Sequence, residues 1–136
     1  MKLAIYNFFI LILIPVFVLR IFVKSFADPD YTKLFLNRFG YNFSGFKQSN
    51  KKIIWFHAVS LGEVIGSQML INKLAEHFDI VITTSTPTGL RRAKELFSAD
   101  IAINYAPWDF VFFINRFLNF YKPDAILIFE TEIWPS

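Results

Sequence analysis

Residues 53–65 read IIWFHAVSLGEVI, and this stretch decides the fold. Its first part is rich in β-branched and aromatic side chains, which predicts a strand over residues 53–59. Beyond the polar residues the apolar positions recur at helical spacing, so we expect a helix over residues 61–78. A strand that passes directly into a helix is typical of a βαβ unit in a parallel sheet.

The same alternation continues along the chain. Strands are expected at 79–84, 101–105 and 124–130, and helices at 87–97 and 108–121. Repeated strand–helix–strand units predict an α/β fold, in which helices cover both faces of a parallel sheet. Residues 51–136 would then form half of a doubly wound domain.

The expected helix at 108–121 carries apolar side chains around its whole circumference. Burial in the protein explains this pattern, and contact of one side with a bilayer or with acyl chains is the alternative. We favour burial, because buried helices are more common than membrane-facing ones in such folds.

The chain is unusually apolar for a soluble domain, since 54% of its residues are hydrophobic and 18 are Phe. Residues 3–19 form an apolar run that, at about 1.5 Å per helical residue, is slightly shorter than a hydrocarbon core of about 30 Å. Extension through Arg20 to Val23 gives a membrane span, and an anchor lying in the membrane interface is the alternative. A signal peptide cleaved after Ala27 is disfavoured by the basic residues that precede this site. We therefore expect residues 1–26 to be a membrane-anchor helix.

The formal charge of +3 is unevenly distributed. Residues 1–24 hold three basic residues and no acidic one. A further basic stretch without acids, at 31–62, contains Lys33, Arg38, Lys47, Lys51 and Lys52. Basic residues after an apolar helix favour an anionic membrane surface, whereas no motif for nucleic acid accompanies them. Their excess downstream of the anchor predicts a cytoplasmic location for the body of the protein, joined to the anchor by a basic junction at 27–50.

Polar residues gather where three of the expected strands end. These clusters are Ser60 to Glu63, Thr83 to Gly89, and Glu130 to Glu132. Open α/β sheets bind ligands beyond the carboxyl ends of their strands, near the point where the strand order reverses. We therefore expect carboxylates from two separate strand ends to converge on one crevice.

The cluster Ser60-Leu61-Gly62-Glu63 supports two interpretations. As a capping box, Ser60 would cap the helix and Glu63 would reach back to the backbone N–H of Ser60. As a catalytic group, Glu63 would be a general base that takes a proton from a substrate hydroxyl, an effect typically worth about 10²–10⁴-fold in rate. The two roles compete for the same carboxylate oxygens.

The stretch TTSTPTG at 83–89 has the composition of a helix start, with Thr86 as N-cap and Pro87 in the first turn. Helix starts also bind anions, so a phosphate site that includes Arg91 and Arg92 is equally plausible. Ordinary capping and a solvated surface explain the same residues.

Glu130 and Glu132 lie two residues apart, so a strand would point both to one face. Such a pair can stabilise a cationic, sugar-like transition state, or it can form ion pairs with the basic stretch. His57 lies on an apolar strand and is more simply a core histidine than a ligand. The absence of Cys and of a second histidine at ligand spacing argues against a metal site.

Three motifs together resemble the amino-terminal half of the Kdo transferases, which handle 3-deoxy-D-manno-octulosonic acid in lipopolysaccharide assembly. They are IIWFHAVSLGEV at 53–64, TTSTPTGLRRAKELF at 83–97 and ILIFETEIWP at 126–135. The apolar start followed by Asn37-Arg38-Phe39-Gly40 resembles the membrane anchor of this family and its junction.

This resemblance implies a GT-B fold of two Rossmann-like domains, and transfer of Kdo from CMP-Kdo to a lipid A precursor with inversion. The reaction would occur at the cytoplasmic face of the inner membrane, without a metal or other cofactor. The base of the family falls on Glu63, and the group that stabilises the transition state falls on Glu130. Candidates for binding the acceptor or its phosphates are Ser60, Gly62, Thr86, Thr88, Gly89, Arg38, Arg91, Arg92 and Glu132, together with Lys47, Lys51 and Lys52.

The sequence ends at Ser136, before the domain that holds CMP-Kdo in this family. We therefore expect the 136-residue chain by itself to be inactive, because positioning the two reactants supplies much of the rate enhancement. A complementary carboxyl-terminal chain would be one route to activity. The alternative hypothesis is a non-catalytic, membrane-anchored protein that binds anionic lipid or a partner chain.

Overall fold

The computed structural model describes residues 2–45 and 49–129. Four parallel strands form one sheet in the order β3-β2-β1-β4. Their bounds are β1 Ile53–His57, β2 Asp79–Thr84, β3 Ala102–Tyr105 and β4 Ala125–Ile128. This arrangement confirms the prediction of an α/β fold with a parallel sheet.

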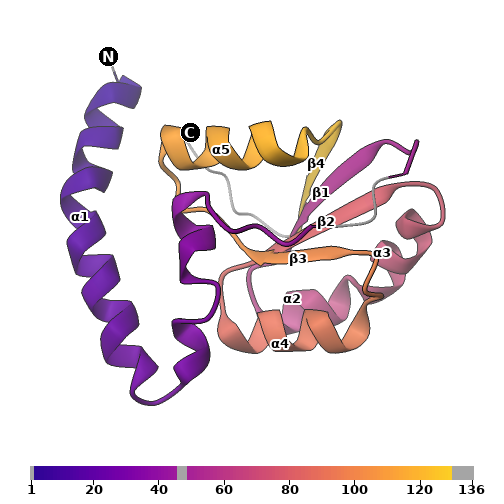
Figure 1. Ribbon diagram of the computed structural model, residues 1–136, viewed down its shortest axis with the longest axis horizontal. Helices are drawn as coiled ribbons and strands as arrows, with labels where there is room; N and C mark the ends of the chain where they lie inside the picture. The colour runs from indigo at the N-terminus through magenta and orange to yellow at the C-terminus, as the bar shows by residue number, and fades with distance from the viewer. Residues whose placement is uncertain (1, 46–48, 130–136) are drawn as a thin grey trace.

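Helices cover the sheet on both faces (Figure 1). One face carries α2 (Leu61–Gly66), α3 (Gln68–Ala75) and α4 (Pro87–Leu96), and the other carries α5 (Val111–Tyr121). Strand β4 is an edge strand that pairs only with β1, and all four of its residues are exposed. Among the described residues, β4 therefore leaves one edge of the sheet exposed.

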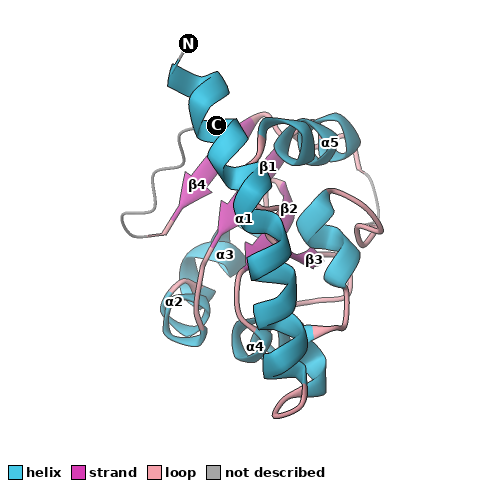
Figure 2. Cartoon of the chain, turned by 90° about the vertical axis from the view of Figure 1, so that its left-hand side faces the viewer, coloured by secondary structure: helices cyan, strands magenta, loops and turns pink. Residues whose placement is uncertain are grey.

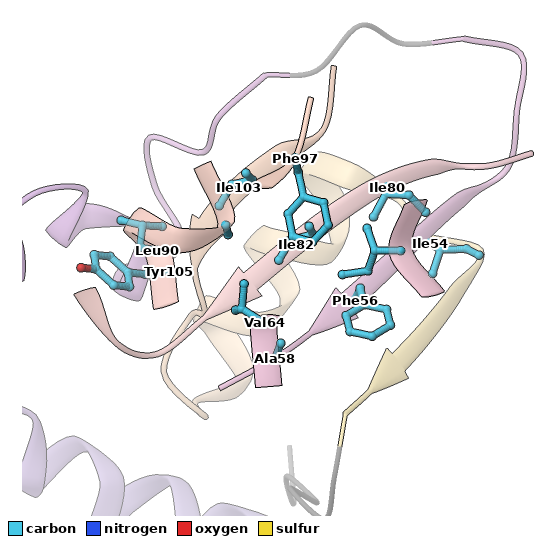
Figure 3. Packing of buried hydrophobic residues seen from close by; sticks show 12 residues of the cluster. Ile54, Phe56, Ala58, Val64, Ile80, Ile82, Leu90, Phe97, Ile103 and Tyr105 are labelled. Atoms are coloured by element: carbon cyan, nitrogen blue, oxygen red, sulfur yellow. The ribbon is translucent and has the colours of Figure 1, made fainter. Parts of the chain in front are cut away.

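The core follows the alternation of side chains along the strands, which places neighbouring residues on opposite faces of the sheet. Phe56 and Ile82 pack under the α2–α4 side, in the cluster drawn in Figure 3. Trp55 and Val81 point the other way, where Phe117 of α5 covers them. The Trp55 and Phe117 rings lie 4.4 Å apart.

The single helix predicted over residues 61–78 is wrong, because the chain forms two helices that meet at Ser67. The Ser67 hydroxyl donates to the carbonyl oxygen of Val64 at 3.1 Å, and Ser67 follows Gly66 directly. A Gly-Ser pair, with a hydroxyl competing for a helical carbonyl, is a common cause of a break. The break tilts α3 away from α2 while the apolar spacing continues.

Helix α1 (Lys2–Ser25) lies beside the body of the protein (Figure 2). One stripe of it faces the body: the Tyr6 hydroxyl donates to Asp109 at 2.6 Å, Phe17 packs on Trp108 at 5.8 Å, and Ile21 is buried. Its other faces expose large apolar side chains over most of the helix length. In length and composition α1 could cross a membrane.

Helix α5 has one buried face and one exposed apolar face. Phe113, Ile114 and Phe117 are buried in the protein, as the burial interpretation predicts. Phe112 and Phe120 remain 55% and 56% exposed. Phe112 shares a hollow with Phe8 and Leu11 of α1, so the apolar outer face of α5 adjoins that of α1 there.

The junction after the anchor folds into two short 3₁₀ helices, η1 (Pro29–Tyr31) and η2 (Phe35–Phe39). Phe39 packs against Trp108 and Phe113, with ring centroids 5.0 and 5.3 Å away. Gly40 ends η2 in the left-handed region, at φ +80°. The motif at 37–40 therefore turns the chain from the anchor onto α5 and the sheet.

We expect Gly40→Ala to destabilise the fold by about 1–3 kcal/mol, because a non-glycine residue in a strained backbone region costs about that much. An added Cβ would also lie 2.9 Å from both the Phe113 carbonyl oxygen and the Arg116 Cβ. Thermal unfolding in detergent measures the loss. Gly45→Ala is the matched control, since a Cβ there meets nothing within 4 Å. Equal stability of the two variants would contradict this account of the junction.

Part of the expected junction at 27–50 packs into the domain. Phe43 joins the α5 side of the core, 5.1 Å from the Phe117 ring. The Ser44 backbone N–H donates to Asn104 Oδ1 at 2.7 Å, which ties this segment to β3. The sequence did not predict this contact, because the partners of Ser44 lie about sixty residues away in the sequence.

Candidate functional site

The site lies where the strand order reverses. Strand β1 stands between β2 and β4, so the sequence order changes direction across β1 and β4, and open α/β sheets bind ligands at this position. The two strands end together: His57 is in register with Ile128, and the Phe129 N–H donates to the His57 carbonyl at 2.9 Å. Glu130 and Glu132 lie outside the described residues, so their roles stay predictions.

Glu63 lies in the first turn of α2, directly beyond β1. Its Oε2 accepts a hydrogen bond from the Val59 backbone N–H at 2.6 Å. Its Oε1 accepts a hydrogen bond from the Ser60 hydroxyl at 3.1 Å. The side chain is only partly buried. The carboxylate is therefore held in one orientation while one side of it remains open to solvent.

This geometry differs from the predicted capping box. Ser60 is the N-cap residue, but its side chain makes no cap hydrogen bond and donates to Glu63 instead. Glu63 in turn reaches the backbone N–H of Val59 rather than that of Ser60. Each carboxylate oxygen has two acceptor sites, so Oε1 retains one beyond its bond to Ser60. Capping and proton abstraction can thus share the same side chain.

Gly62 leaves space beside this carboxylate. The residue is exposed, and a Cβ built on it would meet nothing within 4 Å. The fold does not need glycine here for a close approach. The open backbone next to Glu63 is instead compatible with a bound substrate.

The second polar cluster meets the first. The Thr84 hydroxyl and the Ser85 backbone N–H both donate to the Val59 carbonyl, at 2.9 and 3.0 Å. Gly89 lies against the same loop, where an added Cβ would overlap the Thr84 hydroxyl and lie 3.3 Å from the Ser60 carbonyl carbon. Gly89 is thus explained by close packing, and its proposed contact with an acceptor stays a prediction.

Helix α4 begins as expected. Thr86 is the N-cap and accepts a hydrogen bond from the Gly89 N–H at 3.1 Å, with Pro87 in the first turn. The Thr88 hydroxyl is exposed and donates to the Thr86 hydroxyl oxygen at 3.3 Å. The capping interpretation accounts for Thr86, while Thr88 remains accessible to a ligand.

The two arginines of α4 already have acidic partners. Arg91 pairs with Asp28 at 3.1 Å and also with Asp30, at the base of the anchor. Hydrogen bonds to Lys33 and then to Arg91 hold the pKa of Asp30 below its usual range. Arg92 pairs with Glu95 at 3.0 Å. Phosphate binding by either arginine stays a prediction, and it would compete with these carboxylates.

Arg38 differs from them in being buried, with 6% of its surface exposed. One guanidinium N–H donates to the Ser85 carbonyl at 3.2 Å, and the group stacks over the Tyr105 ring at 4.1 Å. Burial lowers the pKa of the Arg38 guanidinium and raises the pKa of the Tyr105 phenol to about 12. The sequence marks Arg38 as basic but carries no signal that the fold would bury it.

The basic stretch does not form one patch in the described structure. Lys51 lies just before β1 and donates to the carbonyls of Ala75 and Glu76, the latter at 3.2 Å. That position is the amino end of the sheet, opposite Glu63. Lys52 adjoins it, and Lys47 lies outside the described residues. Arg38, by contrast, reaches the carboxyl end of β2 through its hydrogen bond to the Ser85 carbonyl.

His57 is a core residue. It is buried, and its Nδ1 lies 2.8 Å from the Thr83 hydroxyl, which also accepts a hydrogen bond from the Trp55 indole N–H at 2.7 Å. Within residues 2–45 and 49–129, no three His, Asp or Glu side chains gather as metal ligands. Among the described residues, the groups at the carboxyl ends of the strands are thus one oriented carboxylate, Glu63, with hydroxyls and backbone amides around it.

The geometry agrees with the sequence relationships of the chain. Residues 34–136 match the profile of a family described as 3-deoxy-D-manno-octulosonic-acid transferase (Kdo transferase). The chain belongs to this family. The matched region contains β1, the Glu63 loop, the start of α4 and the junction that holds Arg38.

Several curated relatives support this assignment. A 3-deoxy-D-manno-octulosonic acid transferase of Haemophilus influenzae is 34% identical over 134 residues, which cover 96% of this chain and 31% of the relative. One from Chlamydia trachomatis is 29% identical over 119 residues, covering 85% and 27%. A bifunctional glycosyltransferase/methyltransferase of Fusobacterium nucleatum is 35% identical over 109 residues, covering 76% and 17%.

The chain spans about a third or less of the length of these relatives. No solved structure matches it significantly.

Proposed function

We propose that this chain is the membrane-anchored, acceptor-binding part of a Kdo transferase, and that Glu63 is its general base. The reaction moves Kdo from CMP-Kdo to a sugar hydroxyl of a lipid A precursor, with inversion at the anomeric carbon. The observation that supports this proposal most is the position of Glu63: an oriented, partly open carboxylate at the reversal point of the sheet.

In this mechanism the chain has three tasks. It orients Glu63 through Val59 and Ser60, it leaves room for the acceptor beside Gly62, and it removes the proton from the attacking hydroxyl. Glu130, at the end of the neighbouring strand, would stabilise the positive charge that develops on the departing sugar. Neither step requires a metal ion.

The donor belongs to a second Rossmann-like domain of a GT-B fold. CMP-Kdo would bind there, across a cleft from the carboxyl ends of β1 and β4. Transfer is therefore proposed for a protein that includes this donor-binding domain. For the 136 residues alone we expect no transfer, because proximity and orientation of two bound reactants supply several kcal/mol of the barrier reduction, about 7–11 in well-oriented systems.

Helix α1 would hold the site at the cytoplasmic face of the inner membrane. Its stripe toward the body contacts Asp109 and Trp108, whereas its outer face and Phe112 of α5 are apolar and exposed. A helix with this distribution can place its outer face among acyl chains, either crossing the membrane or lying along its interface. The acceptor, itself a lipid, would then reach Glu63 without leaving the membrane surface.

A transfer assay tests this proposal. The native protein is produced in a host that lacks its own Kdo transferase, and its membranes receive CMP-Kdo and a lipid A precursor. We expect the mass of the acceptor to increase by whole Kdo residues, as measured by mass spectrometry. Binding of the acceptor without any change in its mass would contradict transfer and would favour a membrane-anchored lipid-binding protein.

A further inference from the structure

A pocket of about 570 Å³ lies between α1 and the body of the protein. Its apolar wall includes Ile10, Ile14 and Phe17, which are spaced by four and three residues along one stripe of α1. Its polar wall includes Arg38 and Ser85, at the carboxyl end of β2. The pocket thus has one apolar wall, which suits an acyl chain, and one cationic wall.

Arg38 is a buried cation with incomplete hydrogen bonding. Its side chain lines the pocket, and its Nε is buried without a hydrogen-bond partner. Within the described part of the chain, Arg38 forms no ion pair with a carboxylate. A buried charge is costly unless an opposite charge accompanies it. The buried guanidinium of Arg38 therefore favours an anionic partner.

Two further cations line the same pocket from α1. Arg20 and Lys24 are one helical turn apart, and Lys24 Nζ lies 5.4 Å from the centre of the Tyr31 ring. Like Arg38, neither forms an ion pair among the residues that the structure describes. Arg20 and Lys24 lie near the carboxyl end of the anchor helix α1, and Arg38 lies in the junction that follows it.

One acidic residue, Asp109, also lines the pocket. Its Oδ2 accepts the hydrogen bond from Tyr6, fourteen residues before Arg20 on α1. At about 1.5 Å per residue, that separation is about 21 Å along the helix axis. Asp109 is therefore bonded to a different level of α1 from Arg20 and Lys24, whereas its neighbour Trp108 donates a backbone N–H to the Arg38 carbonyl. The lining carries three positive charges against one negative charge.

We propose that this pocket binds an acylated lipid whose phosphate headgroup carries a net negative charge. The phosphate lies among Arg38, Arg20 and Lys24, and an acyl chain lies along Ile10, Ile14 and Phe17 toward the bilayer. Guanidinium groups suit phosphate because they donate parallel hydrogen bonds in a fixed geometry. Inorganic phosphate would leave the apolar wall unused, and a neutral lipid would leave Arg38 unpaired.

The pocket is linked to the catalytic loop by three consecutive hydrogen bonds. Arg38 donates to the Ser85 carbonyl, the Ser85 N–H donates to the Val59 carbonyl, and the Val59 N–H donates to Glu63. A lipid held at Arg38 would thus stabilise the loop that orients the base. The inference rests on the proposed membrane location of α1 but does not require Kdo transfer.

Binding of short-chain lipids to the 136-residue chain in detergent tests the inference, with no donor present. The probe is dihexanoyl phosphatidic acid, compared with dihexanoyl phosphatidylcholine and with inorganic phosphate, and binding is followed by isothermal titration calorimetry. We expect Arg38→Gln to weaken binding of phosphatidic acid at least about tenfold, because hydrogen bonds to charged groups contribute on this scale. Lys73→Gln is the control, since Lys73 is exposed on α3 and does not line the pocket.

The double variant Arg20→Gln/Lys24→Gln covers the case in which loss of Arg38 unfolds the protein, because both residues are exposed. We expect it to weaken binding by a similar factor while the melting temperature stays unchanged. Equal affinity in all variants, or equal affinity for phosphatidylcholine or inorganic phosphate, would overturn the inference. Competition by phosphatidylglycerol or by a lipid A precursor then identifies a bilayer phospholipid or the acceptor as the source of the phosphate. Failure of the transfer assay would leave this binding result unaffected.

Discussion

Replacement of Glu63 by glutamine is expected to reduce Kdo transfer by about 10²–10⁴-fold, the range over which a general base contributes. Glutamine keeps the size of the side chain and an oxygen that can accept the hydrogen bond from Val59. The loop geometry should therefore persist while the proton acceptor is lost. Initial rates of Kdo incorporation, measured with the native protein and the variant at equal membrane content, give the effect.

Stability measurements separate this role from capping. Glu63→Gln should unfold within a few degrees of the native protein, and Glu95→Gln should retain its full rate as a surface control. Glu63→Ala removes both hydrogen bonds to the loop and should lower both the rate and the melting temperature. If Glu63→Gln transfers Kdo at the native rate while Glu63→Ala unfolds, the residue is a capping group and the assignment as base is wrong.

The second large effect is expected at Gly89, where alanine should destabilise the fold by about 1–3 kcal/mol or more through overpacking. An added Cβ overlaps the Thr84 hydroxyl, which is itself hydrogen-bonded to Val59, and presses on the backbone of Ser60. The loop that carries Glu63 cannot move away without losing these bonds. Denaturant unfolding in detergent measures the loss, and we expect transfer to decrease as well.

Gly62→Ala is the matched control on the same loop. A Cβ at position 62 meets nothing within 4 Å, and alanine favours a helix over glycine by up to about 1 kcal/mol. Its stability should equal or slightly exceed that of the native protein. A Gly89→Ala variant as stable as Gly62→Ala would mean that the two helix starts do not pack as described.

The main elements of the fold were predictable because their patterns are local. The β-branched and aromatic composition of 53–59 predicted β1, and the sequence Thr86-Pro87 predicted the start of α4. The break at Ser67 was not predicted, because the apolar spacing continues through it and only a side-chain hydrogen bond interrupts the helix. The packing of Phe43 against Phe117 was missed for a different reason: it joins segments far apart in the sequence.

In the candidate site, too, some features follow from the topology and others depend on the loop conformation. The contact between the Ser60–Glu63 and Thr83–Gly89 clusters follows from parallel strands whose carboxyl ends lie side by side. The predicted convergence of carboxylates involves Glu130 and Glu132, which lie outside the described residues, and stays a prediction. The exact partners of Glu63 depend on the loop conformation and could not be read from spacing. The burial of Arg38 depends on how the junction folds back over Tyr105, and a basic residue in a polar stretch gives no sign of that.

The central claim is that the acceptor hydroxyl reaches the loop that carries Glu63. A lipid A precursor with a photoreactive diazirine beside the hydroxyl that accepts Kdo tests it most directly, in membranes that contain the native protein. After irradiation and digestion, mass spectrometry locates the labelled peptide. We predict label on residues 59–63 or 85–89, and its loss when unmodified acceptor is added in excess. Label confined to the outer face of α1, or label that excess acceptor does not displace, would contradict the account.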